Sequence, residues 1–341
     1  MNLLTNSAAK AFRSCQRLYQ IRYKLGYKPT KESSALYFGT AMHAGLEAWT
    51  ATKDLEVALA AVQCSDPFDQ VKVEELLRGY HFMWLDAPYA ALRVEEQFED
   101  ELVNPASGKA SKIWRVSGKL DGLVQDTDGK VWILEHKTSS EEVSPGSDYW
   151  KRLQMDSQVS MYYTGARAIG YEPAGCLYDV IRKPTIQPHA IALVDENGQK
   201  IVVDQDGERV RTKDGKKWRE TGDASLGYVV QSRPELPEEY RARLREDIAA
   251  KPEQYYQRGI VVRLEEDEKD AAADVWATAK GIREAELAQR WPRNPDACTK
   301  WNRTCEYWEV CTRTESLENT LLYRKAEIHE ELSQKQPEAA E

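Results

Sequence analysis

Two carboxylates and one amine lie at the ends of consecutive extended segments of the chain. Asp121 closes one of these segments, and Glu135 and Lys137 follow the apolar run at 131–134 in the next. Because successive side chains of a β-strand point to opposite faces, Glu135 and Lys137 share one face while His136 points away. Neighbouring strands lie about 4.8 Å apart, so the two acids and the amine can meet at one point.

This combination of side chains suits the hydrolysis of a phosphodiester bond. Asp121 and Glu135 offer the oxygen ligands that Mg²⁺ or Mn²⁺ binds, and the carbonyl of His136 could complete the coordination shell. Lys137 would then orient a water molecule or stabilise negative charge on the phosphate. A structural alternative is an ordinary ion pair between Glu135 and Lys137, with Asp121 simply preceding a turn at Gly122.

Hydrophobic periodicity predicts the elements that position these residues. Three extended segments predict an antiparallel meander, whose last two strands are joined by a turn at Asp128-Gly129. A further strand is predicted at 175–182, in the same sheet. The strands of the meander are predicted at 92–98, 113–124 and 131–137, and the helices of this half of the chain at 5–23, 37–52, 71–85 and 149–169.

Two of these helices carry polar residues at helical spacing. His43 lies beside the apolar face of the helix at 37–52, and Gln158 and Tyr162 lie one turn apart in the helix at 149–169. Each also has a structural alternative. His43 would fit a packed helix histidine, and Gln158 and Tyr162 would fit a polar surface stripe.

Four short segments, in this order along the chain, resemble the motifs of the PD-(D/E)XK nuclease superfamily. The resemblance is to its RecB-like branch, which includes the Cas4 and AddB nucleases. It covers residues 3–182 and resumes at the last cysteines. The segments are Gly-Thr-Ala-Met-His at 39–43, Gly-Lys-Leu-Asp-Gly at 118–122, Glu-His-Lys-Thr at 135–138, and Gln158-x-x-x-Tyr162.

This resemblance implies a fold, an activity and a set of site residues. The fold would be α/β, with a restriction-endonuclease-like core in which helices flank a central mixed β-sheet. The activity would be that of an Mg²⁺- or Mn²⁺-dependent DNA exonuclease in recombination, repair or phage DNA processing. An inactive DNA-end-binding or scaffold protein with the same fold is the alternative. The implied metal ligands are His43, Asp121 and Glu135, Lys137 is the catalytic lysine, and Gln158 and Tyr162 line the DNA and support the site.

The cysteines suggest a second metal centre. Cys298, Cys305 and Cys311 lie close together near the C-terminus, while Cys15 stands alone near the N-terminus. Four thiolates satisfy a [4Fe-4S] cluster or a tetrahedral zinc ion. In the Cas4 and AddB relatives, one N-terminal and three C-terminal cysteines bind such an iron-sulfur cluster. The gap of six residues between Cys298 and Cys305 departs from the two residues of many relatives, and three loop cysteines with a core Cys15 remain the alternative.

Turn signals predict the organisation of the rest of the chain. A β-rich insertion at 184–232 follows a nuclease core at 1–183, because Asn197-Gly198, Asp206-Gly207 and Asp214-Gly215 are hairpin signals. A C-terminal helical and cysteine-bearing segment, expected to pack back on the core, spans 233–325. It contains helices at 237–250 and 266–290 and a strand at 259–264, and a frayed acidic tail is predicted at 326–341.

Composition limits the cell compartment and the partners. The chain has 341 residues, 41% of them hydrophobic, and no stretch approaches the roughly 20 apolar residues of a membrane span. We therefore expect a cytoplasmic protein, in a bacterial or phage-infected cell, with no membrane partner. The net charge of -9 argues mildly against a large nucleic-acid surface. The expected partner is nevertheless DNA with a free end or a single-stranded region, with a recombinase or helicase as a further candidate.

Overall fold

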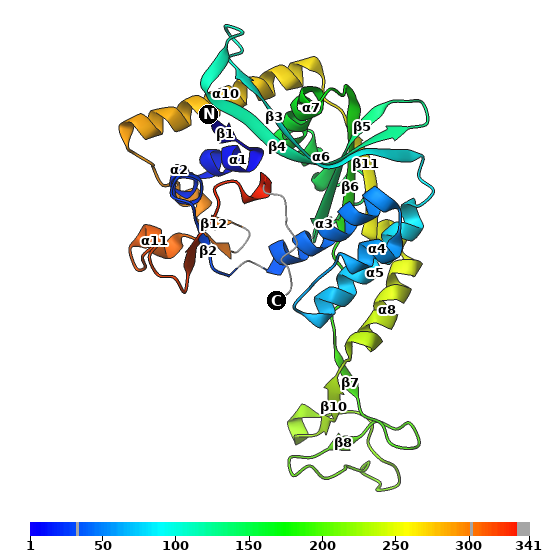
Figure 1. Ribbon diagram of the computed structural model, residues 1–341. Coiled ribbons are helices and arrows are strands. Elements are labelled where there is room, and N and C mark those ends of the chain that lie inside the picture. Colours follow the sequence, from blue (N-terminus) through cyan, green and yellow to red (C-terminus); the bar gives the residue numbers. More distant parts are fainter. Residues whose placement is uncertain (32–33, 301–302, 333–341) are drawn as a thin grey trace, which may run out of the picture.

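A mixed β-sheet forms the centre of the structure, a computed structural model that describes residues 1–31, 34–300 and 303–332 (Figure 1). The spatial order of the strands is β1-β4-β5-β6-β11, and β3 also pairs with β4. The pairs β1–β4 and β5–β6 are parallel, whereas the other pairs are antiparallel. The strands are β1 (Asn2–Leu4), β3 (Tyr89–Val103), β4 (Ala110–Asp126), β5 (Val131–Ser139), β6 (Pro173–Arg182) and β11 (Tyr256–Val261).

The predicted meander and the predicted mixed sheet are confirmed. β3, β4 and β5 pair antiparallel in sequence order, and Gly129 adopts a φ of +82° in the turn between β4 and β5. β6 then runs parallel to β5, which requires a crossover connection, and helices supply it. Short β1, which the sequence analysis missed, adds a parallel strand beside β4.

β4 and β5 separate at the point where the predicted site residues begin. β5 pairs with residues 122–125 of β4, and β1 pairs with residues 114–116. Because β3 pairs along nearly the whole of β4, β1 and β5 must share the other side of this strand. Residues 117–121 lie between these two partners. The sheet therefore opens into a fork at Asp121, where main-chain groups are available to side chains.

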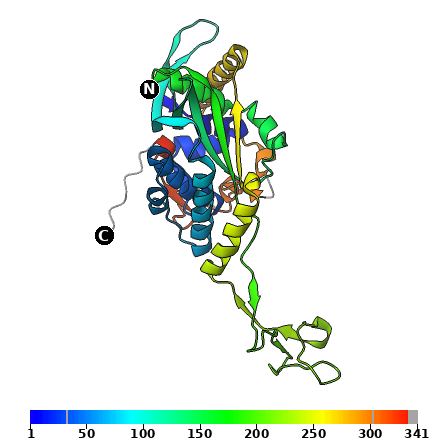
Figure 2. The ribbon, with the colours of Figure 1, turned by 90° about the vertical axis from the view of Figure 1, so that its right-hand side faces the viewer.

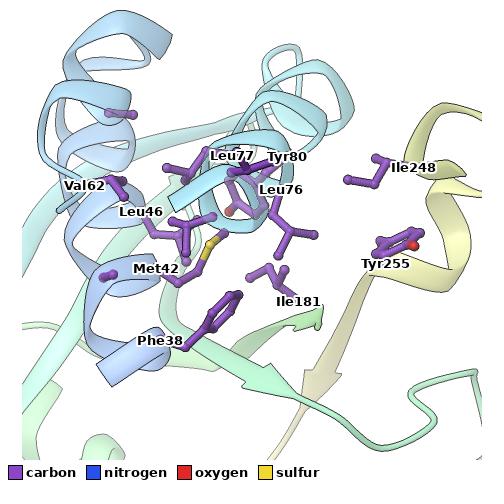
Figure 3. Close-up of a cluster of buried hydrophobic side chains, with 14 of the residues drawn as sticks. Phe38, Met42, Leu46, Val62, Leu76, Leu77, Tyr80, Ile181, Ile248 and Tyr255 are labelled. Carbon is purple, nitrogen blue, oxygen red and sulfur yellow. The ribbon is translucent and has the colours of Figure 1, made fainter. Parts of the chain in front are cut away.

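Helices cover one face of the sheet with the largest apolar cluster (Figure 3). α3 (Ser34–Thr52), α4 (Leu55–Ala60) and α5 (Pro67–Trp84) pack there with α8 (Pro237–Ala250) and α9 (Pro252–Tyr255). Asp66 caps α5 by accepting the N–H groups of Phe68 and Asp69, and Pro67 occupies the first turn. Buried members of this cluster include Phe38, Met42, Leu46, Leu76, Leu77, Tyr80 and Ile181.

A second set of helices covers the opposite face of the sheet. α6 (Asp148–Leu153), α7 (Ser157–Ala168) and α10 (Glu265–Ala288) contribute to the packing on this side. The sequence predicts one helix at 149–169, but the structure has a break at 154–156. Asp156 caps α7 there by accepting the N–H of Gln158 at 2.9 Å, and this new start fixes the rotation of α7.

The predicted helix at 5–23 is also interrupted. α1 (Asn6–Ser14) ends at Cys15, which has an extended backbone, and α2 (Gln16–Tyr19) continues into a π-helical turn (Gln20–Lys24). The N–H of Arg17 is satisfied by the carbonyl of Pro292, so the break is stabilised by a distant segment. Cys15 therefore lies between two helices and not within one.

One segment from near each end of the chain lies beside the other, in the part of the molecule around β2 (Tyr27–Pro29) and α11 (Trp308–Thr312) (Figure 1). β2 pairs antiparallel with β14 (Tyr323–Lys325), next to α11. Part of the segment predicted as a frayed tail contacts the rest of the chain, because Lys28 forms an ion pair with Glu330 at 2.5 Å. Residues 333–341 of that predicted tail lie outside the described residues.

The β-rich insertion projects from the rest of the molecule as an arm, residues 190–234 (Figures 1 and 2). All three predicted turns form, and Gly198, Gly207 and Gly215 have positive φ angles of 76°, 84° and 67°. Its strands are β7 (Ala190–Ala192), β8 (Val202–Val203), β9 (Val229–Val230) and β10 (Ser232–Pro234). Among the described residues, none of the helices combines the length and apolar composition that a membrane crossing needs.

Candidate active site

Asp121 occupies the fork between β4 and β5. Its Oδ2 atom accepts the main-chain N–H of His136 at 2.8 Å, a group that continued pairing of the two strands would have covered. The Nδ1 atom of His43, on α3, lies 3.6 Å from the same oxygen. The fork therefore holds one predicted acid at a fixed place and brings the predicted histidine beside it.

Glu135 and Lys137 face α7, as the alternation of β5 predicts. The Nζ atom of Lys137 forms an ion pair with Oε1 of Glu135. Gln158 donates from Nε2 to the same oxygen at 3.0 Å and to the hydroxyl of Tyr162 at 2.6 Å. The other oxygen of Glu135, Oε2, is buried and has no hydrogen-bond partner among the described residues.

The electrostatics show that these groups act on one another. Burial and the charge of Asp121 raise the pKa of Glu135 to about 8. Burial alone would raise the pKa of Asp121 and lower that of Lys137. Instead, His43 and Lys137 keep the pKa of Asp121 below its usual value, and Glu135 holds the pKa of Lys137 above its usual range. Burial also lowers the pKa of His43, against the attraction of Asp121.

The imidazole of His136 lies on the opposite face of β5, as predicted. Its Nε2 atom is 3.5 Å from the hydroxyl of Thr50, and its Nδ1 atom is 3.7 Å from Asp179. Burial lowers the pKa of His136 to about 4, so the ring is neutral at physiological pH. The contribution of His136 to the site is therefore limited to its main chain, whose N–H orients Asp121.

A buried ion pair that the sequence analysis missed lies next to the ring of His136, on the opposite face of β5 from Glu135. Arg258 on β11 donates to both oxygens of Asp179 on β6, at 2.8 and 2.6 Å. Tyr80 on α5 donates to Asp179 at 2.6 Å, and its ring also contacts that of His136. No local pattern marks these residues, because they come from three separate parts of the chain. Their only sequence signal is a charged residue within an otherwise apolar strand.

Replacing Asp179 by Asn should destabilise the protein strongly. The substitution leaves the guanidinium of Arg258 buried without a countercharge, so we expect the free energy of unfolding to fall by about 3–5 kcal/mol. Urea unfolding measures this change. Glu172→Gln is the matched control, because its partner Arg167 is exposed and the expected loss is below about 1 kcal/mol. Equal losses in the two variants would contradict a buried pair.

A further acid approaches the site from β3. Glu95 has a positive φ of 53° and lies across from Asp121, because its two neighbours in β3 are paired with the two neighbours of Asp121 in β4. Its carboxylate forms an ion pair with Lys119 and acts on the pKa of His43. Strand alternation gives no sign of a residue with a positive φ, so the sequence analysis did not identify this acid.

The site offers a partial set of ligands for a hard cation. Among the described residues, no three His, Cys, Asp or Glu side chains form a complete metal-binding group. Magnesium does not need one, because it retains several waters and is commonly held by one or two carboxylates. The buried, unpaired Oε2 of Glu135 is the observation that fits such an ion, since an unsatisfied carboxylate oxygen costs free energy.

The four predicted cysteines lie around one small cavity near the joined ends of the chain. Cys15, Cys298, Cys305 and Cys311 all line it, together with Tyr307 and other residues of the same region. The N–H of Cys305 donates to the carbonyl of Cys298 at 2.7 Å. Burial raises the pKa values of Cys305 and Cys311, and the neighbouring thiols raise them further.

The long gap between Cys298 and Cys305 has a structural explanation. β12 (Thr299–Lys300) pairs antiparallel with β13 (Arg303–Thr304), and this pairing places Thr299 opposite Thr304. Cys298 and Cys305 flank these two residues, so the pairing makes the two cysteines neighbours. The other two cysteines lie apart from this cavity, Cys64 beside the α3–α5 core and Cys176 in β6.

A match to one family model agrees with these features. The family model described as the PD-(D/E)XK nuclease superfamily matches residues 4–312. A solved structure titled "Crystal structure of SSO0001" is 13% identical in sequence, and the match covers 73% of this chain and 76% of that chain with a TM-score of 0.25. No match was found among curated proteins.

Proposed function

The chain belongs to the PD-(D/E)XK nuclease superfamily, and from this premise we propose that it is an Mg²⁺- or Mn²⁺-dependent deoxyribonuclease that digests DNA from an end. Membership implies nuclease activity. The single observation that carries the proposal at the level of residues is the buried Oε2 atom of Glu135, which has no hydrogen-bond partner among the described residues. The other oxygen of this carboxyl group forms an ion pair with Lys137, and the charge of Asp121 acts on the pKa of Glu135. A cation shared by the two acids would satisfy Oε2.

Each site residue has a role in this proposal. Asp121 and Glu135 hold the cation, and His43 stands beside Asp121 as a further ligand. The cation, when bound, would polarise the phosphate and lower the pKa of a bound water. Lys137 orients the attacking water or stabilises charge on the phosphate. Gln158 holds the carboxyl group of Glu135 against α7 by a hydrogen bond, and the hydroxyl of Tyr162 accepts a second hydrogen bond from the same amide. The resemblance also implies that both residues line the DNA.

End-labelled DNA tests the proposed activity directly. Purified protein is incubated with single-stranded, linear double-stranded and circular DNA in Mg²⁺, Mn²⁺, Ca²⁺ or EDTA. We expect loss of label from linear substrates with Mg²⁺ or Mn²⁺, and little attack on closed circles. Binding of DNA ends without cleavage in any metal would instead support an inactive scaffold. Cutting of closed circles would show an endonuclease.

Metal binding should strengthen as the pH rises toward 8. Because burial raises the pKa of Glu135 to about 8, its carboxyl is mostly protonated at pH 7 and must lose a proton before it binds a cation. Apparent affinity should increase about tenfold per pH unit below that pKa and level off above it. Asp121, whose pKa is lowered, adds no such dependence.

Calorimetric titration with Mn²⁺ at several pH values measures this effect. Repeating it in buffers with different ionisation enthalpies counts the protons released, and we expect up to one per cation. Glu135→Gln is the control, because it removes the titrating group. A wild-type affinity that does not change with pH would exclude Glu135 as a ligand.

We also propose that the four cysteines hold a [4Fe-4S] cluster, with structural zinc as the alternative. The support is that four thiols from both ends of the chain line one cavity, and four is the donor number of either group. In the described residues these thiols do not lie close enough together to form a complete metal-binding group. Elemental analysis of anaerobically purified protein distinguishes the cluster from zinc. Iron, acid-labile sulfide and visible absorbance indicate a cluster, whereas colourless protein with one zinc ion indicates the alternative.

A further inference from the structure

The tip of the arm carries a strong local excess of positive charge, although the whole chain is acidic. The tip hairpin, residues 209–219, contains six cations and a single acid, Asp214. The acids of the arm lie mostly in the two preceding turns, at 195–208. The cations are Arg209, Arg211, Lys213, Lys216, Lys217 and Arg219.

Two of these cations form ion pairs within the arm, and the other four are exposed to solvent. Arg209 pairs with Asp195 at 2.6 Å, and Arg219 pairs with Asp223 at 3.0 Å. Arg211 and the three lysines of the hairpin are exposed. The acid of the hairpin is engaged in its turn, because Asp214 accepts hydrogen bonds from the hydroxyl of Thr212 and the N–H of Lys216. The exposed face of the hairpin is therefore positive.

Contacts within the hairpin hold two of its arginine side chains in place, which lowers the entropic cost of binding. The ring centroid of Trp218 lies 4.5 Å from the guanidinium carbon of Arg209 and 4.0 Å from that of Arg211. Arg211 further donates to the carbonyl of Gly215 at 3.2 Å and closes the turn. Stacked guanidinium groups keep their outer N–H groups available to phosphate oxygens. Such a surface is preorganised for binding a polyanion.

The arm begins at the end of the sheet that holds the candidate active site. β6 runs parallel to β5, with Lys137 opposite Val180 and Ser139 opposite Arg182. The chain leaves β6 directly after these residues and enters the arm, which projects away from the body (Figure 1). A long substrate that leaves the site at this edge would pass the base of the arm.

We propose that the tip hairpin is a second, sequence-independent contact for the phosphate backbone of DNA, remote from the site of cleavage. This inference rests on the proposed function, which supplies DNA as the ligand. The hairpin would hold the DNA on the protein between cleavage events, so its effect depends on substrate length. Short oligonucleotides that occupy only the site would not reach it.

Salt-dependent DNA binding tests the proposal. The arm variant replaces Lys213, Lys216 and Lys217 by Gln, and the control variant replaces Lys112, Lys269 and Lys280, which are exposed elsewhere. Anisotropy of a long labelled duplex is measured over a range of KCl concentrations in Ca²⁺. In the arm variant the slope of log affinity against log salt should be shallower by about 2–3, and affinity at low salt about tenfold lower or more. The control should keep the wild-type values.

Cleavage assays separate this proposal from the proposed function. With a short end-labelled oligonucleotide at saturation, the arm variant should match the wild-type rate, because none of the three lysines belongs to the site. If wild-type protein cleaves DNA but the arm variant keeps the full salt slope, the arm proposal is overturned alone. If neither the wild type nor the arm variant cleaves DNA, but the salt slope of the arm variant is still shallower, the arm binds DNA and the proposed nuclease activity is wrong. If the arm variant binds DNA as tightly as the wild type but binds polyglutamate less tightly, the hairpin is a contact for an acidic protein instead.

Discussion

Replacing Lys137 by Ala should slow DNA cleavage by about 10²–10³-fold at saturating substrate, the usual effect of losing one group that stabilises charge in the transition state. The ammonium of Lys137 lies beside Glu135 and Asp121, and its pKa is held above its usual range, so the group is charged. DNA affinity should change little, because one ammonium is a small part of an extended backbone contact. Single-turnover rates and anisotropy in Ca²⁺ measure the two quantities separately.

The control for this prediction removes the same charge from the same hairpin. Lys130→Ala lies at the turn between β4 and β5, outside the site, and should cleave DNA at the wild-type rate. Because Lys137→Ala also leaves Glu135 buried without its partner, thermal unfolding of each variant must be compared. A folded Lys137→Ala protein that retains a rate within about tenfold of wild type would exclude a catalytic role for this lysine.

The position of Lys137 could be predicted because strand alternation is a strict geometric rule. Once β5 was recognised, Glu135 and Lys137 had to face one side and His136 the other, and both placements are observed. The prediction that Asp121 lies near Glu135 needed one further assumption, that the two consecutive strands pair with each other. Local periodicity therefore gave both the elements and the meeting of the acids.

The fork between β4 and β5 could not be predicted in the same way. It arises because β1, from the start of the chain, occupies the side of β4 that β5 has left. The break at Cys15 has a similar cause, since the N–H of Arg17 is satisfied by the distant Pro292. Tertiary contacts decided both features, and a periodic pattern of apolar residues contains no information about them.

Buried charge was the most serious omission of the sequence reading. Asp179 and Arg258 come from β6 and β11 and meet only because these strands pair antiparallel, with the two residues directly opposite. Hydrophobic patterns identify apolar positions, and a lone charge within such a pattern is easily assigned to the surface. Its partner was about eighty positions away, beyond any local motif.

The cysteine centre gives the second large expected effect. Cys305→Ser should lose most of the bound metal and lower the melting temperature by about 10 °C, because a group held by these residues would join the two ends of the chain. A crosslink that closes so long a loop contributes about 4 kcal/mol. Serine has nearly the volume of cysteine, so packing changes contribute little to this loss.

A second cysteine provides the control for this effect. Cys64 is half-buried beside the α3–α5 core, away from the cavity, so Cys64→Ser should keep the metal and nearly all of the stability. Cleavage by Cys305→Ser should persist below its new melting temperature, since the cavity residues are separate from those that contact Asp121, Glu135 and Lys137. If the two serine variants melt together and contain equal metal, the four thiols do not form a stabilising centre. A stable but inactive Cys305→Ser protein would instead connect the cysteine centre to catalysis.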